Sequence, residues 1–175
     1  MKIGKIILMC LCLLGFQANA NLIEINLDKT ELAPNDILNV TLLANFTDSI
    51  DGFDFDFVFD TNIFSFVDDS EDTDIPNAGF FSIFAVAANS TGLGIGYLDF
   101  FDSINGEYYI SFALEALTAG TSTFDLEVNL LENSFLGVNY TLDDVDSKTA
   151  SVPAPGALSI LFIALVAMTR VKRRN

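Results

Sequence analysis

The sequence contains no histidine and no tryptophan, and it has only two cysteines among its 175 residues. Without histidine the chain cannot form a Ser–His–Asp triad, use a histidine general base or build an ordinary histidine-ligated zinc site. Both cysteines, Cys10 and Cys12, lie in an N-terminal segment that has the features of a removable signal. We therefore expect the mature protein to have no disulfide, no thiol nucleophile and no thiolate metal site.

Basic residues are almost absent from the body of the chain. All 24 acidic residues lie between residues 21 and 151, where they face only Lys29 and Lys148, so this part carries a formal charge of −22. Such a surface repels nucleic-acid phosphates and anionic membranes, and it favours cations or basic partners. We expect no nucleic-acid binding. Paired carboxylates, as in glycosidases, are the one catalytic arrangement left open. With so many acids such pairs arise by chance, and we predict that the protein is not an enzyme.

The first 20 residues have the three parts of a secretory signal peptide. Lys2 and Lys5 form a basic start, Ile6–Phe16 is apolar, and Ala18 and Ala20 form a small-residue cleavage site. The apolar part has 11 residues, too few for a membrane span. We therefore expect export across the inner membrane, with the domain beginning at residue 21.

The chain ends in a short apolar run followed by a basic cluster. The run is Ala157–Met168, and the cluster consists of Arg170, Lys172, Arg173 and Arg174. The run is short for a membrane span, which needs about 17–25 residues, and its length alone fits a core or surface helix equally well. The basic end favours a transmembrane anchor helix over residues 156–175, because lysine and arginine can snorkel and the positive-inside rule keeps this end in the cytoplasm.

The last 24 residues resemble a known sorting signal. Val152, Pro153, Ala154 and Pro155, followed by the apolar run and the basic end, are similar to the PEP-CTERM signal of Gram-negative bacteria. Ala154 stands where that motif has glutamate. The resemblance implies processing by an exosortase-type membrane transpeptidase, with transient anchoring in the inner membrane and release to the cell surface or extracellular matrix.

Between the two targeting segments, apolar residues recur with a period of two. Phe53, Phe55, Phe57 and Phe59 alternate with acidic residues and Val58, and residues 124–130 alternate in the same way. Successive side chains of a strand point to opposite faces, so each segment has one face for a core and one for water. Nine strands are predicted, at 22–27, 37–44, 52–59, 63–67, 79–87, 95–101, 107–117, 122–131 and 135–142. We interpret Gly92–Gly96 (GLGIG) as a turn.

Nine short strands separated by turn residues predict an all-β antiparallel sandwich. Residues 32–36 (LAPND), 51–60 and 110–120 also resemble cohesin domains in order and spacing. That resemblance implies a nine-stranded jelly-roll sandwich related to carbohydrate-binding modules, and its best-studied members bind dockerin modules. We place this domain at residues 21–146 and a linker, including the Val-Pro-Ala-Pro motif, at 147–155.

One loop is unusually acidic. It contains Asp68, Asp69, Glu71, Asp72 and Asp74. Hard oxygen ligands in a flexible loop suit calcium, which makes these five residues candidate metal ligands. Their spacing differs from that of an EF-hand, so a solvated loop is the alternative. Asp143, Asp144 and Asp146 are interpreted as an acidic linker.

These features predict a non-enzymatic, exported protein of the cell surface or extracellular matrix. The alternative is a binding module for a carbohydrate, such as an extracellular polysaccharide, or for a protein. A binding module should show a contiguous aromatic or apolar patch on an otherwise acidic sheet, whereas an enzyme should show a cleft with two facing carboxylates. The adjacent Tyr108 and Tyr109 must point to opposite faces of a strand, so at least one is a candidate for exposure.

Overall fold

The alternation of phenylalanine and aspartate places one face of strand β3 (Gly52–Val58) in the core of the computed structural model. Phe53, Phe55 and Phe57 are buried, as predicted, and Phe59 is buried just after the strand. Asp54, on the opposite face, is exposed. The period-two pattern therefore specifies both the strand and its orientation.

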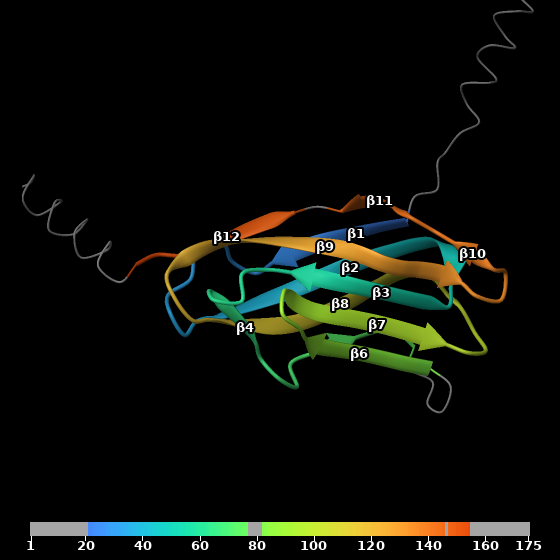
Figure 1. Cartoon of the computed structure of the whole chain (residues 1–175), viewed down its shortest axis with the longest axis horizontal. Helices are drawn as coiled ribbons and strands as arrows, with labels where there is room; N and C mark the ends of the chain where they lie inside the picture. The colour runs from blue at the N-terminus through green and yellow to red at the C-terminus, as the bar shows by residue number, and fades with distance from the viewer. Residues whose placement is uncertain (1–20, 77–81, 146, 155–175) are drawn as a thin grey trace, which may run out of the picture.

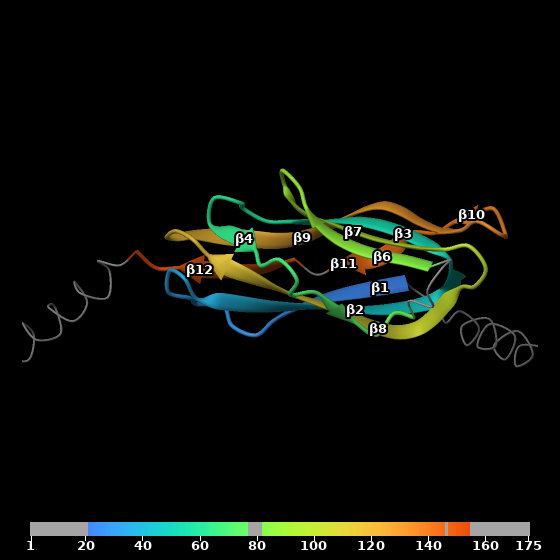
Figure 2. The ribbon, with the colours of Figure 1, turned by 90° about the horizontal axis from the view of Figure 1, so that it is seen from below.

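The structure describes residues 21–76, 82–145 and 147–154, which form two sheets packed face to face (Figures 1 and 2). No described residue is helical. The strands of the first sheet are β1 (Asn21–Leu27), β2 (Ile37–Ile50), β4 (Phe64–Phe66), β5 (Asp72–Thr73), β8 (Ile104–Ala116) and β11 (Leu142–Val145). Those of the second sheet are β3, β6 (Ser82–Ala88), β7 (Gly92–Asp99), β9 (Gly120–Asn133), β10 (Val138–Asn139) and β12 (Lys148–Val152).

The strand order of the first sheet is β11-β1-β2-β8-β4, with β5 also paired to β8. In the second sheet it is β10-β9-β3-β7-β6, with β12 paired to β9. All of these strand pairs are antiparallel except β1–β11, which is parallel. The prediction of a two-sheet all-β sandwich is thus confirmed for the described residues, which contain twelve strands rather than nine.

Aromatic side chains from both sheets fill the space between them. The rings of Phe53 and Phe55 stack with centroids 4.6 Å apart, and Phe57 meets Phe112 of the first sheet edge to face at 5.1 Å. Phe124 of β9 lies 5.8 Å from Phe57 in a stacked arrangement. With no disulfide expected in the mature chain, stability depends on apolar burial, to which these rings and the buried aliphatic side chains both contribute.

Strand β9 contains a bulge that the sequence pattern did not predict. Asp54 pairs with Leu130 but Phe55 pairs with Val128, so Asn129 is an additional residue on β9. An additional residue shifts the alternation of the strand by one position. Leu130, predicted to face the core, is therefore 37% exposed, while Leu131 is 2% exposed and takes the inward position.

The interpretation of Gly92–Gly96 as a turn was wrong, because these residues form the first part of β7. Leu93 and Ile95 are buried in the core, and the three glycines lie on the opposite face of the strand. Gly92 has a φ of +152°, and a Cβ on it would lie 2.0 Å from the Phe57 carbonyl oxygen. A close approach of two backbones, rather than a turn, explains glycine at this position.

The chain remains part of the sandwich beyond Asp146, where we expected the domain to end. Residues 142–145, expected to be partly an acidic linker, pair with β1, and residues 148–152 pair with β9 as β12. Ala150 and Val152 are buried in the core. The strand predicted at 135–142 is shorter in the structure, because residues 134–137 form a turn and only Val138 and Asn139 pair with β9.

Candidate functional site

The acidic loop before β6 is attached to β8 by hydrogen bonds. The Ala113 backbone N–H donates to Ser70 Oγ at 2.9 Å, and Thr73 Oγ1 donates to the Tyr109 carbonyl oxygen at 2.6 Å. Asp72 and Thr73 then pair with β8 as the short strand β5. The loop is therefore an ordered edge of the first sheet.

Two of the five candidate calcium ligands accept hydrogen bonds from this strand. The Tyr109 hydroxyl donates to Asp72 Oδ2 at 2.9 Å, and the Tyr109 N–H donates to Asp74 Oδ1 at 2.7 Å. The hydrogen bond to Asp72 raises the pKa of the Tyr109 hydroxyl. Asp68, Asp69 and Glu71 are exposed. Among the described residues, no three acidic side chains are placed to hold one metal ion together.

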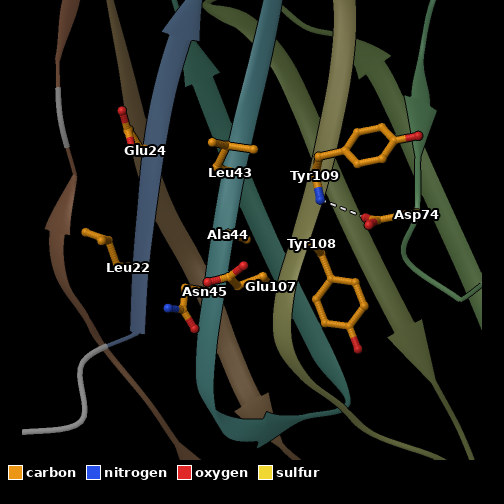
Figure 3. A pocket seen from close by; sticks show the side chains of 9 residues that line it. All are labelled: Leu22, Glu24, Leu43, Ala44, Asn45, Asp74, Glu107, Tyr108 and Tyr109. Carbon is orange, nitrogen blue, oxygen red and sulfur yellow. Dashed lines mark hydrogen bonds between the residues drawn. The ribbon is translucent and has the colours of Figure 1, made fainter.

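Beside Tyr109, the outer face of the first sheet is hollowed by a depression of about 440 Å³ (Figure 3). We call it the acidic depression. It is lined by Leu22, Glu24, Leu43, Ala44, Asn45, Asp74, Glu107, Tyr108 and Tyr109. Cross-strand pairing brings together the lining residues of β1, β2 and β8, and Asp74, which follows β5, is joined to them by its hydrogen bond with the Tyr109 N–H. Glu24 pairs with Leu43 and Leu43 with Tyr109, while Leu22 pairs with Asn45 and Asn45 with Glu107.

The adjacent tyrosines have different environments, as strand alternation predicts. Tyr108 packs toward the core, with its ring 6.5 Å from that of Phe46, and its hydroxyl donates to the Asn105 carbonyl oxygen. Tyr109 belongs to the outward row with Leu43. Tyr97 is buried on β7, where burial and then the charge of Asp99 raise its pKa to about 12.

The outer face of the second sheet presents small and apolar side chains. We call this surface the apolar strip and define it as Ile83, Ala85 and Ala87 of β6 with Gly96 and Leu98 of β7. Pairing places Ile83 beside Leu98 and Ala85 beside Gly96, and Ile83 is 57% exposed. A depression of about 390 Å³ continues from these residues to Asp54, Leu130 and Glu132. The sequence pattern did not predict this surface.

Large apolar side chains are also exposed at one end of the sandwich. Phe100 and Phe101 follow β7, and Phe135 and Leu136 follow β9. Phe135 and Leu136 are 61% and 68% exposed. We call these two loops the loop tip. Asp51 joins them, because its carbonyl oxygen accepts from the Asp99 N–H and its carboxylate accepts from the Phe135 N–H.

The proposed sorting motif begins inside the sandwich. Val152 is buried in β12, whereas Pro153 and Ala154 are exposed just beyond it. Val152 pairs with Gly120, the first residue of β9, so the chain leaves the sandwich at the end opposite the loop tip (Figure 1). Outside the described residues lie Pro155, the basic residues Arg170, Lys172, Arg173 and Arg174, and the cleavage residues Ala18 and Ala20. Within the described part, no helix is long and apolar enough to cross a membrane.

The described sandwich is similar in fold to cohesin domains. A type II cohesin domain from the cellulosome of Acetivibrio cellulolyticus matches with a TM-score of 0.61 and 14% identity, over 76% of this chain and 95% of that domain. The second type II cohesin module of an adaptor scaffoldin from the same organism matches with a TM-score of 0.60 and 13% identity, over 82% and 97%. A chain of a type I cohesin–dockerin complex from Clostridium thermocellum matches with a TM-score of 0.54 and 15% identity, over 75% and 99%.

No family model matches the sequence, and no curated protein matches it. At identities of 13–15% the structural matches show the fold. The described residues form a cohesin-like β-sandwich of two sheets.

Proposed function

We propose that this chain is an exported, non-enzymatic protein-binding module that docks a partner protein on the apolar strip. The observation that carries this proposal is the exposed position of Ile83, Ala85 and Ala87 on β6, with Ile83 beside Leu98 of β7. Antiparallel sheets with one face in water normally carry polar residues there. A contiguous apolar surface on an otherwise acidic domain is typical of an interaction site.

The charges around the apolar strip indicate what the partner presents. Asp54 of β3 lies beside Gly96 of β7, and Asp56 and Glu132 lie along the same face. A partner with an apolar centre and a basic rim would bury the strip and neutralise these carboxylates. Partners rich in acidic groups would be repelled by the charge of this surface.

The structural matches support a protein as the ligand class. The Clostridium thermocellum match is a chain of a complex between a cohesin and a dockerin. We propose that this sandwich likewise receives a folded protein domain.

For location, we propose the route that the terminal segments indicate. The signal peptide directs export, the C-terminal helix anchors the chain in the inner membrane, and an exosortase-type enzyme processes the tail before release to the cell surface or extracellular matrix. Strand β9 has 14 residues and so spans about 45 Å. An anchor that follows Ala154 would hold the loop tip at about this distance from the point of attachment.

Site-specific photo-crosslinking in the producing cells tests the docking surface. A photoreactive phenylalanine analogue at Ala85 should form a discrete crosslinked species with one partner protein. The same analogue at Ile37, which is exposed on the first sheet, is the control and should not capture that partner. Capture of the same partner from both positions, or of none from Ala85, would contradict the proposal.

Cell fractionation tests the proposed route separately. Replacing Arg170, Lys172, Arg173 and Arg174 with neutral residues should change the fraction in which the mature protein is found. Unchanged sorting would show that the tail does not determine location, whatever the result at Ala85.

A further inference from the structure

The acidic depression lies on the opposite side of the sandwich from the apolar strip, and it combines two kinds of side chain. Leu22 and Leu43 are 40% and 44% exposed there, at outward positions of an antiparallel sheet where polar residues are usual. Glu24 is directly opposite Leu43, and Glu107, which is opposite Asn45, is diagonal to Leu43. Directly opposed residues have Cβ atoms about 4.5–5.5 Å apart and diagonal ones about 7–8 Å, so both glutamates lie near Leu43.

The charge in this depression is all of one sign. Glu24, Asp74 and Glu107 contribute carboxylates from three different segments. The two lysines of the described residues are elsewhere: Lys29 follows the far end of β1, and Lys148 lies on β12 of the second sheet. Neither lysine lines the depression. A cation brought here by a ligand would gain favourable interactions with several carboxylates at once.

The apolar residues narrow the choice of cation. A bare metal ion gains nothing from leucine, and the described carboxylates do not gather into a metal site. Lysine and arginine side chains, by contrast, carry an alkyl stem that packs on apolar surface and a charged end that reaches polar groups. Tyr109 lines the depression on the side of Asp74, and its ring adds a face that attracts cations (Figure 3). Hydrogen bonds from Tyr109 to Asp72 and Asp74 hold this ring and the rim of the depression in place.

We infer that the acidic depression binds a lysine- or arginine-containing segment of a protein, as a second site independent of the apolar strip. The alkyl stems of its basic residues pack on Leu22 and Leu43, and their charged ends reach Glu24, Glu107 and Asp74, which lie at different sides of the depression. Apolar neighbours of these basic residues in the bound segment increase the contact with the leucines. The site therefore selects basic amphipathic sequence over basic sequence alone.

The experiment uses the full-length chain in zwitterionic detergent and a fluorescein-labelled peptide, acetyl-Lys-Leu-Lys-Leu-Lys-amide, with binding followed by fluorescence anisotropy. Because any basic peptide is attracted to this protein, the informative comparison is between variants of equal charge. Replacing Glu24 and Glu107 with glutamine should weaken binding about tenfold or more. The control replaces Asp125 with asparagine and Glu127 with glutamine on the outer face of β9, and should weaken binding less than about threefold.

A second pair of variants tests the apolar contribution. Leu43→Ala should weaken binding about fivefold, whereas Leu117→Ala, with a similar exposure of 42%, should leave it unchanged. Ile83→Glu on the apolar strip should also leave peptide binding unchanged, which separates this site from the proposed docking surface. Equal losses for the two acidic pairs would reduce the effect to general attraction and overturn the inference. Binding of neutral cello-oligosaccharides in place of the peptide would also overturn it, by showing a carbohydrate site.

Discussion

The carboxylate of Asp51, which is fully buried, accepts hydrogen bonds from both the backbone N–H and the hydroxyl of Ser134 at 2.8 Å. Asp51 lies in the β2–β3 turn and Ser134 begins the turn after β9, so this contact joins segments 83 positions apart in the sequence. The same carboxylate accepts the Phe135 N–H at 3.3 Å. Asp51 therefore fixes the backbone that presents the exposed side chains of the loop tip.

Asp51→Ala is expected to lower the free energy of unfolding by about 2–5 kcal/mol. The substitution removes a buried carboxylate that accepts from the Ser134 N–H and hydroxyl and from the Phe135 N–H, and a hydrogen bond to a charged group contributes about 1.5–3 kcal/mol. Asp54→Ala, at an exposed position on the neighbouring strand, should change stability by less than about 0.5 kcal/mol. Urea unfolding of residues 21–154 measures both, and similar small effects for the two variants would contradict the role assigned to Asp51.

Two phenylalanines provide a matched test of the core. Phe55 is fully buried, and Phe55→Ala should lower the free energy of unfolding by about 3–5 kcal/mol through lost burial and the cavity left behind. Phe135 is exposed at the loop tip, and Phe135→Ala should cost less than about 1 kcal/mol. A loss below about 1 kcal/mol for Phe55→Ala would place that side chain on the surface and disprove the strand orientation.

The sequence predicted β3 correctly because large apolar residues at every second position leave one arrangement that buries them all. It predicted β12 poorly, because the inward residues Ala150 and Val152 are small and lie beside a proline-containing motif typical of a linker. The bulge at Asn129 depends on pairing with β3, which no pattern within β9 reveals. Leu130 was therefore assigned to the wrong face.

The candidate sites were less accessible to prediction than the fold. Asp72 and Asp74 were recognised as unusual, but their contacts with Tyr109 depend on β5 lying against β8. The apolar strip was missed because Ile83, Ala85 and Ala87 belong to a run in which nearly every residue is apolar. Such a run has no alternation to indicate which residues face water. The acidic depression likewise requires three strands that are distant in sequence.

Gly92 and Gly94 are expected to respond differently to alanine. Gly92→Ala would place a Cβ 2.0 Å from the Phe57 carbonyl oxygen at a φ of +152°, so β3 and β7 would have to separate. We expect a loss of about 2–4 kcal/mol, in the range of other strained backbone substitutions. Gly94→Ala would meet nothing closer than 3.8 Å and should be neutral or slightly stabilising, because alanine restricts the unfolded chain. Thermal unfolding of the two variants compares them, and equal effects would contradict this account of β7.

Tyr97 should be resistant to ionisation in the folded protein. Burial and the nearby charge of Asp99 raise its pKa from 10.0 to about 12. Because the folded state favours the neutral phenol, this group stabilises the fold fully below pH 10 and loses its contribution as the pH rises through about 12. Asp99→Asn should lower the pKa of Tyr97. Tyrosinate absorbance during alkaline titration measures the pKa of Tyr97 in the unsubstituted chain and in the Asp99→Asn variant. A Tyr97 that titrates near 10 in the unsubstituted chain would contradict the burial argument.

The most direct test of the proposed function is the affinity for the partner captured from Ala85, measured by calorimetry with two isoleucine-to-glutamate variants. Ile83→Glu places a charge within the apolar strip and should weaken binding about 100-fold or more, because the charge must be desolvated in the complex. Ile37→Glu makes the same chemical change at an exposed position of the first sheet and should alter the affinity less than about threefold. Equal affinities for the two variants would show that the partner binds elsewhere, and would contradict the assignment of the apolar strip as the docking surface.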